Sequence, residues 1–210
     1  FTKALNSHAD GLSFDLEDSV TADKKFEARN ALAQLLVSPE LLASKKKIII
    51  RVNSVDSQYF MDDLISVIKP GVDMINLPKI ESPKMIDMAV KAISEAEQKN
   101  NVQQNAKSSI RLLINIETPK SLRIAHELAS AHERVAALQL GLGDLFEPYG
   151  IERNNMRVVE QAMFSMAMAA HESGIAAYDG AFANIANQEA FKEEALIAKS
   201  LGFLGKSCIH

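Results

Sequence analysis

Acidic side chains gather just after apolar segments of this sequence, and the first such group is the densest. In "FDLEDSV" (14–20) an apolar run leads into three carboxylates within four residues, Asp15, Glu17 and Asp18. Negative charge beside an apolar segment costs solvation free energy unless the acids face water, a basic side chain or a bound cation. These acids are therefore expected to face water, a basic side chain or a bound cation, and the rest of the chain has to decide among these three.

Other polar residues follow later apolar runs in the same way. They are Arg51 and Asn53 after "KIII", Lys79 and Glu81 after "MINLP", Glu117 at the end of "LLINIE", Asp144 after "LQLGLG", and Asp179 at the end of "AAYD". This set lacks histidine and cysteine, the ligands that zinc prefers. Two carboxylates with open positions suit Mg²⁺, with Mn²⁺ as an alternative, because such an ion keeps waters and accepts substrate oxygens. We predict that Glu117 and Asp144, at the ends of neighbouring strands, bind one such ion.

Arg51 and the segment "GLGDL" (141–145) are candidate substrate contacts. The planar guanidinium of Arg51 can bind a carboxylate or a ketone oxygen. Successive amides along Gly143, Asp144 and Leu145 could bind a substrate carboxylate, since glycine allows close approach of the backbone.

Structural roles compete with these assignments. Arg51 can pair with Glu17 or Asp18 and lock two strands together. A single acid at a strand end often caps a helix or forms a salt bridge in a loop. Lys79 suits a structural role, and Asp179 with the following glycine is a common turn pair.

The apolar runs predict seven short strands that alternate with amphipathic helices. The predicted strands are 11–16, 47–52, 73–78, 111–117, 135–141, 175–180 and 202–209, and the predicted helices are 1–8, 24–37, 83–99, 118–131, 156–174 and 187–202. Several strands are nearly continuous apolar runs, which is typical of parallel strands covered on both faces. The polar segment 97–109 predicts a surface loop, and polar residues on the helices are predicted to be solvated.

Repeated strand–helix units predict an α/β fold, either a doubly wound sheet or a (β/α)₈ TIM barrel. The glycine-rich turn of a dinucleotide-binding sheet, G-x-G-x-x-G, is absent, which favours the barrel. Seven strands leave the barrel one short, so we expect its first strand to precede residue 1. In a barrel the polar residues above would share the rim at the carboxyl ends of the strands.

Bulk composition narrows the class of protein further. A chain of 210 residues with 47% apolar and 24% charged residues predicts one globular domain, 1–210. A net charge of −4 gives no reason to expect nucleic-acid or membrane binding. The single cysteine, Cys208, excludes an internal disulfide and fits a reducing compartment, so we expect a cytoplasmic protein, or a mitochondrial-matrix protein in a eukaryote.

Several motifs together carry a family resemblance. In order along the chain they are "FDLEDSVTADKKFEAR", "RVNS", "LPKIES", "IETPKSL", "LGLGDL" and "DGAF" followed by "LGFLGKSCIH". The chain resembles the citrate lyase β-subunit-like family of the HpcH/HpaI aldolase superfamily, which includes malyl-CoA, citramalyl-CoA and β-methylmalyl-CoA lyases. The resemblance implies a (β/α)₈ barrel that binds Mg²⁺ and cleaves or forms a bond between an acyl-thioester enolate and an α-keto acid.

The resemblance also implies roles for single residues. Glu117 and Asp144 match the metal ligands of the family, and Arg51 matches the arginine that contacts the keto acid. Glu17 and Asp18 match acids near the waters of the metal.

Other implications concern the ends of the chain and its partners. Lys3 lies where related lyases direct a basic residue toward the CoA phosphates. Relatives open with a strand and an "FVPG"-like turn, and their C-terminal segment forms a lid that carries an acid into a neighbouring subunit. We expect this chain to be truncated at both of these ends, and the resemblance implies a trimer or hexamer.

These expectations lead to a function. We expect a Mg²⁺-dependent lyase that cleaves a 3-hydroxyacyl-CoA, such as citramalyl-CoA or malyl-CoA, into acetyl-CoA and pyruvate or glyoxylate. One alternative is the β subunit of a citrate lyase, acting on citryl groups bound to an acyl carrier protein. Another is a non-catalytic barrel that retains the metal site as a binding partner.

Overall fold

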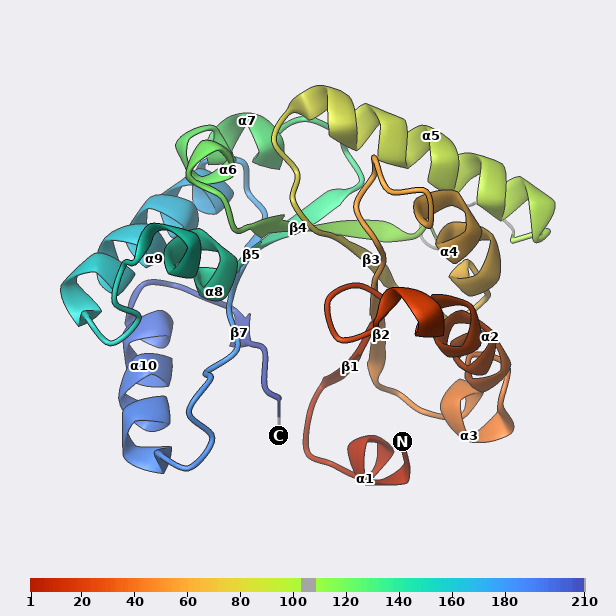
Figure 1. The fold of residues 1–210 in the computed structure, drawn as a ribbon, viewed down its shortest axis with the longest axis horizontal. Coiled ribbons are helices and arrows are strands. Elements are labelled where there is room, and N and C mark those ends of the chain that lie inside the picture. The colour runs from red at the N-terminus through yellow and green to blue at the C-terminus, as the bar shows by residue number, and fades with distance from the viewer. Residues whose placement is uncertain (103–108, 210) are drawn as a thin grey trace. The chain divides into compact units, whose positions relative to one another are not determined.

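A computed structural model describes residues 1–102 and 109–209 of the chain (Figure 1). The chain divides into two compact units, the first formed by Phe1–Pro78 with Asp87–Leu112 and the second by Lys79–Ile86 with Leu113–His210. The division falls within helix α5 (Pro83–Lys99) and strand β4 (Arg111–Ile116).

The first unit is built on parallel strands that neighbour one another in chain order. These are β1 (Gly11–Asp15), β2 (Lys47–Arg51) and β3 (Met74–Leu77), and the register places Asp15 opposite Arg51. Its other elements are α1 (Thr2–Leu5), η1 (Ala22–Lys24), α2 (Lys25–Leu35), α3 (Pro39–Leu42) and α4 (Phe60–Val67). Helix α2 packs against α4, as Figure 1 shows.

The second unit contains the end of β4 and three further strands. Strand β5 (Val135–Leu140) pairs in parallel with β6 (Ala176–Asp179), which pairs in parallel with β7 (Gly205–Lys206). Its helices are α6 (Pro119–Arg123), α7 (Ala125–Ala129), α8 (Leu142–Phe146), η2 (Glu147–Tyr149), α9 (Met156–Glu172) and α10 (Gln188–Ser200). Helix α9 packs on β5 and β6, and α10 packs on β7 (Figure 1).

All seven predicted strands are present, and six of them differ from the prediction by one or two residues, so the α/β class with parallel strands is confirmed. The strand predicted at 202–209 is much too long, since β7 contains two residues. A closed eight-stranded barrel and a single domain stay predictions. The predicted helix 118–131 is instead two short helices, because Ile124 leaves the helical region of the backbone with φ −108° and ψ 22°. The loop predicted at 97–109 begins too early, since α5 extends to Lys99, and residues 103–108 lie outside the described residues.

Burial follows the apolar pattern most closely in β4 and in the end of β3. After exposed Arg111, β4 is buried throughout, whereas β2 alternates between buried and partly exposed positions. The prediction that polar residues on helices are solvated is wrong for Arg29, Glu97 and Glu194, which are 7%, 1% and 2% exposed. Two of these, Arg29 and Glu194, form ion pairs inside their units, and that pairing compensates for the lost hydration.

Among residues 1–102 and 109–209, none of the helices has both the length and the apolar character that crossing a bilayer requires.

Candidate active site residues in the two units

The last residues of β1 and β2 form a two-pronged ion pair in the first unit. Arg51 donates from Nε to Oδ1 of Asp15 at 2.7 Å and from Nη2 to Oδ2 at 2.6 Å. The parallel register places these two residues directly opposite each other, which explains the geometry. Burial alone would raise the pKa of Asp15, but the bonds from Arg51 and from the backbone amide of Glu17 outweigh it and lower the pKa from 3.8 to about 2.

The third nitrogen of the Arg51 guanidinium faces the two other acids of the segment. Nη1 lies 3.1 Å from Oε2 of Glu17 and 3.9 Å from Oδ2 of Asp18. The Glu17 side chain is 6% exposed and that of Asp18 is 52% exposed. Burial would lower the pKa of Arg51, but the adjacent carboxylates, led by Asp15, raise it well above its ordinary value. The strand-locking alternative for Arg51 is therefore present in the structure, and its main partner is Asp15.

Glu117 is the most enclosed acid among the predicted metal ligands. It is 2% exposed and follows the last residue of β4. Its Oε1 accepts a hydrogen bond from the backbone amide of Lys79 at 2.6 Å, and its Oε2 accepts one from Nδ2 of Asn115 at 3.2 Å. Lys79 has a positive φ of 53°, which is uncommon for a residue with a side chain. Lys79 thus contributes its backbone to the site, in keeping with the structural role predicted for it.

The motif that follows Glu117 fixes its backbone. The Thr118 hydroxyl caps helix α6 by accepting a bond from the Ser121 amide, and the Ser121 hydroxyl accepts bonds from the amides of Glu117 at 3.2 Å and Thr118 at 3.0 Å. Ser121 is fully buried. This reciprocal capping satisfies amides that a helix start leaves unpaired, so the carboxylate of Glu117 projects from a rigid base.

Gly141 brings the segment that carries Asp144 against Glu117. Its amide donates to the carbonyl of Ile116 at 3.0 Å. A Cβ added at Gly141 would lie 2.6 Å from Cβ of Glu117 and 2.9 Å from its Oε2. Asp144 follows three residues later, exposed in the first turn of α8. Only glycine fits here, because any side chain at this position would overlap Glu117, so the backbone of residue 141 packs directly against the Glu117 side chain.

The donor atoms in this part of the second unit fit a hard divalent cation. Glu117 and Asp144 offer carboxylate oxygens, and Oδ1 of the buried Asn115 forms no hydrogen bond with the described residues. Within the described ranges no three His, Cys, Asp or Glu side chains converge as a metal-binding group. Two carboxylates that leave positions for water and substrate oxygens are the usual setting for Mg²⁺, so the predicted pair remains chemically suitable.

The predicted turn residue Asp179 belongs to a buried ionic network. Its Oδ2 accepts from Nζ of Lys206 at 2.5 Å, and the same ammonium lies 2.6 Å from Oε1 of Glu194. Arg153 completes the network with two 3.0 Å bonds to Glu194. Burial raises the pKa of Asp179 despite Lys206, whereas Arg153 and Lys206 overcome the burial of Glu194 and lower its pKa. The Gly180 amide also donates to Oδ1 of Asp179 at 2.7 Å.

The remaining predicted contacts are less enclosed. Lys3 is exposed on α1 in the first unit, and Gly143 is exposed on α8 in the second. The Leu145 amide donates to the carbonyl of Gly141 within α8, so it is not available to bind a substrate oxygen in this conformation. Glu81 pairs weakly with Lys120 at 3.7 Å.

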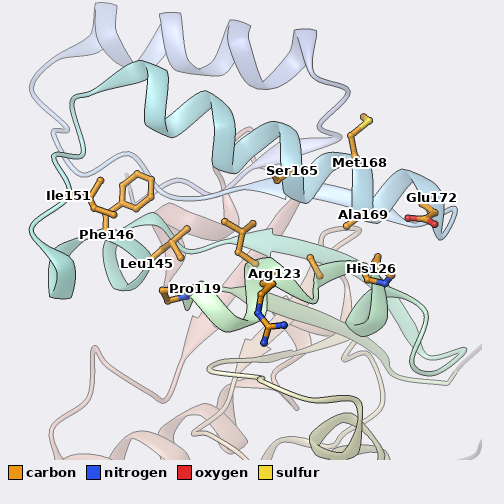
Figure 2. A pocket seen from close by; sticks show the side chains of 12 residues that line it. Pro119, Arg123, His126, Leu145, Phe146, Ile151, Ser165, Met168, Ala169 and Glu172 are labelled. Carbon is orange, nitrogen blue, oxygen red and sulfur yellow. The ribbon is translucent and has the colours of Figure 1, made fainter.

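A groove of about 630 Å³ lies among helices α6, α7, α8 and α9 of the second unit (Figure 2). Figure 2 shows Phe146 and Ile151 at one end and His126 and Glu172 at the other. Its lining is mainly apolar, and Leu145 is the predicted site residue that contributes to it. Glu172 is the one acidic residue among the described residues that line the groove, so the groove does not contain the pair of carboxylates predicted to bind the metal.

Several polar residues that shape these clusters were missed from the sequence. In the first unit they are Lys25, Arg29 and Asp63, and in the second they are Arg153, Glu194 and Lys206. One feature of the sequence could have indicated that such residues are buried, namely a charged residue on the apolar side of a helix, as for Glu194, or within an apolar strand, as for Lys206. This feature does not say which other charged residue is its partner, because buried and solvated charges look the same in a sequence.

In this protein, parallel strands end in residues that offer carboxylate oxygens, and the predicted metal ligands include neither histidine nor cysteine. This arrangement is typical of α/β enzymes that bind hard divalent cations. The chain belongs to the HpcH/HpaI aldolase/citrate lyase family, whose family model matches residues 1–210.

Curated relatives carry two kinds of lyase name. The citrate lyase subunit beta of Haemophilus influenzae is 35% identical over 202 residues, which cover 96% of this chain and 68% of the relative. The Escherichia coli K12 citrate lyase subunit beta is 34% identical and covered to 66% of its length. The L-malyl-CoA/beta-methylmalyl-CoA lyase of Rhodobacter capsulatus is 26% identical, with coverage of 100% of this chain and 71% of the relative. The chain thus spans about two thirds of the length of its citrate lyase relatives.

Solved structures support the fold assignment. The Mycobacterium tuberculosis citrate lyase beta subunit, complexed with oxaloacetate and magnesium, matches with a TM-score of 0.76 at 25% identity over 96% of this chain and 82% of that one. A citrate lyase from Burkholderia xenovorans matches with a TM-score of 0.84 at 19% identity, over 95% of this chain and 65% of that one. The latter similarity concerns the fold alone.

Proposed function

We propose that this chain carries catalytic residues of a Mg²⁺-dependent carbon–carbon lyase that cleaves a 3-hydroxyacyl thioester into a shorter acyl thioester and an α-keto acid. The observation that carries the proposal is the buried Glu117 carboxylate, oriented by the Lys79 amide and Asn115, with Gly141 bringing the segment of Asp144 close to it. Membership of the aldolase and citrate lyase family supports the reaction class.

In the second unit, Glu117 and Asp144 would hold the cation through their carboxylate oxygens. When bound, Mg²⁺ supplies a Lewis acid that lowers the pKa of a substrate hydroxyl and stabilises the negative charge on its oxygen. The rigid backbone at Glu117 lets its carboxylate keep one orientation, which favours binding because little side-chain freedom is lost.

In the first unit, Asp18 and Arg51 suit the proton transfer and the developing charge. Asp18 is the exposed acid of its segment, and it would accept the proton of the substrate hydroxyl, directly or through water. As that proton leaves, the carbon–carbon bond breaks, the hydroxyl carbon becomes the ketone, and the electron pair passes to the thioester fragment as an enolate. The enolate carbon then takes up one proton from solvent, and Asp18 releases to solvent the proton that it accepted, so the reaction is balanced. Arg51 would stabilise charge on the ketone oxygen, and Glu17 would assist as the second acid beside it.

Two thioester carriers suit the proposed reaction. A CoA thioester such as malyl-CoA is supported by the name of the R. capsulatus lyase, and citramalyl-CoA is a second candidate of the same kind. A citryl group on an acyl carrier protein is the carrier that a citrate lyase β subunit would use, and the higher identity to the citrate lyase beta subunits favours that alternative. Both share the 3-hydroxyacyl thioester that the proposed chemistry requires.

The metal assignment is tested by titrating the full-length protein with Mg²⁺ by calorimetry, in the absence and presence of pyruvate. Glu117→Gln should weaken Mg²⁺ binding by more than about 10-fold, because an amide oxygen replaces a charged ligand. Glu127→Gln, an exposed acid on α7 of the same unit, is the matched control and should bind like wild type.

Two outcomes would contradict the proposal. Wild-type affinity in Glu117→Gln would remove Glu117 from the metal site. A wild-type protein that binds no Mg²⁺, even with pyruvate, would contradict the proposed Mg²⁺-dependent reaction.

A further inference from the structure

The carbonyl groups of the acidic segment after β1 are held by side chains that the proposed reaction does not use. Lys25, the first residue of α2, donates from Nζ to the carbonyls of Leu16 at 2.7 Å and Glu17 at 2.6 Å. Its ammonium also lies 5.9 Å from the centre of the Tyr59 ring. A half-buried lysine whose ammonium donates hydrogen bonds to two successive main-chain carbonyls restrains the orientation of both peptide groups.

A second donor reaches the same segment through a buried relay. Asn53 donates from Nδ2 to the carbonyl of Leu16 at 3.0 Å and to Oδ2 of Asp63 at 2.6 Å. Asp63 is 1% exposed, and its Oδ1 accepts from Nε of Arg29 at 2.9 Å. A buried carboxylate requires such a partner, so Arg29 fixes Asp63, Asp63 fixes Asn53, and Asn53 fixes the Leu16 carbonyl.

The amide side of the segment is held independently. Asp15 accepts bonds from the amides of Glu17 at 2.9 Å and Ser19 at 3.1 Å, while its carboxylate is anchored by Arg51. The amides therefore bond to Asp15 and the carbonyls bond to Lys25 and Asn53. Restraint from both sides sets the backbone from which the Glu17 and Asp18 side chains project toward Arg51.

We propose that Lys25, together with the relay of Arg29, Asp63 and Asn53, positions the acidic segment 15–18 for proton transfer in the lyase reaction. This inference rests on the proposed function of Asp18 and Glu17 as acids of the reaction. These four are positioning residues, since they act through the backbone of the segment. Holding a reacting group in place matters because a misplacement of about 1 Å can reduce a rate about 100-fold.

The test compares Lys25→Met, which keeps the aliphatic stem, with Lys25→Arg, whose guanidinium can again donate to both carbonyls. Lys24→Met is the matched control, because the neighbouring Lys24 is 61% exposed and pairs with Glu27 on the surface. Each full-length variant is assayed for kcat and KM with citramalyl-CoA, malyl-CoA and citryl-loaded acyl carrier protein, and for amide hydrogen exchange across residues 16–20. Asn53→Ala, which removes the second donor and leaves the Arg29–Asp63 pair intact, tests the relay.

We expect Lys25→Met to lower kcat about 10- to 100-fold with little change in KM, and to speed exchange of the Glu17 and Ser19 amides. Lys25→Arg should restore most of kcat, and Lys24→Met should match wild type. Unchanged exchange in Lys25→Met, or faster exchange with wild-type kcat, would overturn the positioning role. A wild type that cleaves no thioester would overturn the proposed function and the catalytic part of this inference, whereas exchange would still decide whether Lys25 fixes the segment.

Discussion

Asp15 shows at the scale of single residues how this protein keeps an acid ionised in a partly buried place. Burial opposes its charge, but Arg51 and two backbone amides provide more stabilisation than burial removes. Because Arg51 also contacts Glu17, removing Asp15 would change the position of the one guanidinium on which the proposed reaction depends.

Asp15→Asn should therefore lower the free energy of unfolding at pH 7 by about 1–2 kcal/mol, allowing for the partial solvent exposure of the pair. The folded pKa of Asp15, about 2, lies below its ordinary value of 3.8, so its stabilisation is fully present above pH 4 and is lost as pH falls toward 2. Urea unfolding at pH 7, 4 and 2.5 should show the difference between wild type and variant shrinking over that range. Asp10→Asn, an exposed acid just before β1, should show little difference at any pH. If the difference in the free energy of unfolding between wild type and Asp15→Asn stayed the same at all three pH values, the low pKa of Asp15 would not be the source of the stabilisation.

At the scale of elements, the buried network of the second unit ties β6, β7 and α10 to the segment before α9. Lys206 on β7 bonds to Asp179 on β6 and Glu194 on α10, and Arg153 bonds to Glu194 from the connection that precedes α9. Two cations and two carboxylates balance, so the network is neutral as a whole. The strand β7 is only two residues long, which makes this side-chain bonding a substantial part of its attachment.

Lys206→Met should destabilise the protein by about 3–5 kcal/mol at neutral pH, because it leaves the fully buried Asp179 without its cation. Loss of Lys206 removes an interaction that lowers the pKa of Asp179, so that pKa rises further above its ordinary value. The folded variant then binds a proton that the unfolded chain releases, and its stability falls as pH rises above about 4. Chemical unfolding at pH 5 and pH 8 should show the larger loss at pH 8. Lys199→Met, an exposed position at the end of α10, should change stability by less than about 0.5 kcal/mol.

At the scale of the whole molecule, the proposed reaction depends on a divalent cation. The carboxylate and amide oxygens near Glu117 favour such an ion, and a citrate lyase beta subunit of similar fold was solved in complex with magnesium. Treatment of the full-length protein with EDTA should abolish cleavage of its thioester substrate, and added Mg²⁺ should restore it. Parallel assays with citramalyl-CoA, malyl-CoA and citryl-loaded acyl carrier protein identify the carrier. Turnover that persisted after complete removal of divalent cations would contradict the proposed mechanism.

Much of the local structure could be predicted because it depends on short-range patterns. The apolar runs located all the strands, and α5 begins and ends where its amphipathic pattern does, at Pro83 and Lys99. The prediction of a single helix at 118–131 was wrong. The helix breaks at Ile124, which is itself apolar, so the break does not interrupt the apolar periodicity of the sequence. Short helices such as α4 were missed because they contain too few turns to show a period.

The sequence by itself determined that acids and Arg51 stand at the ends of strands, because strand ends are marked by where apolar runs stop. Only the tertiary structure decided that Arg51 pairs first with Asp15, since that choice depends on the register of β1 against β2. It also decided that Arg29 and Asp63 are buried partners and that Lys25 bonds to backbone carbonyls. Lys25 and Asp63 each have a neighbour of like charge in the sequence, Lys24 and Asp62, and the packing of the helices decides which of the two charges loses contact with water.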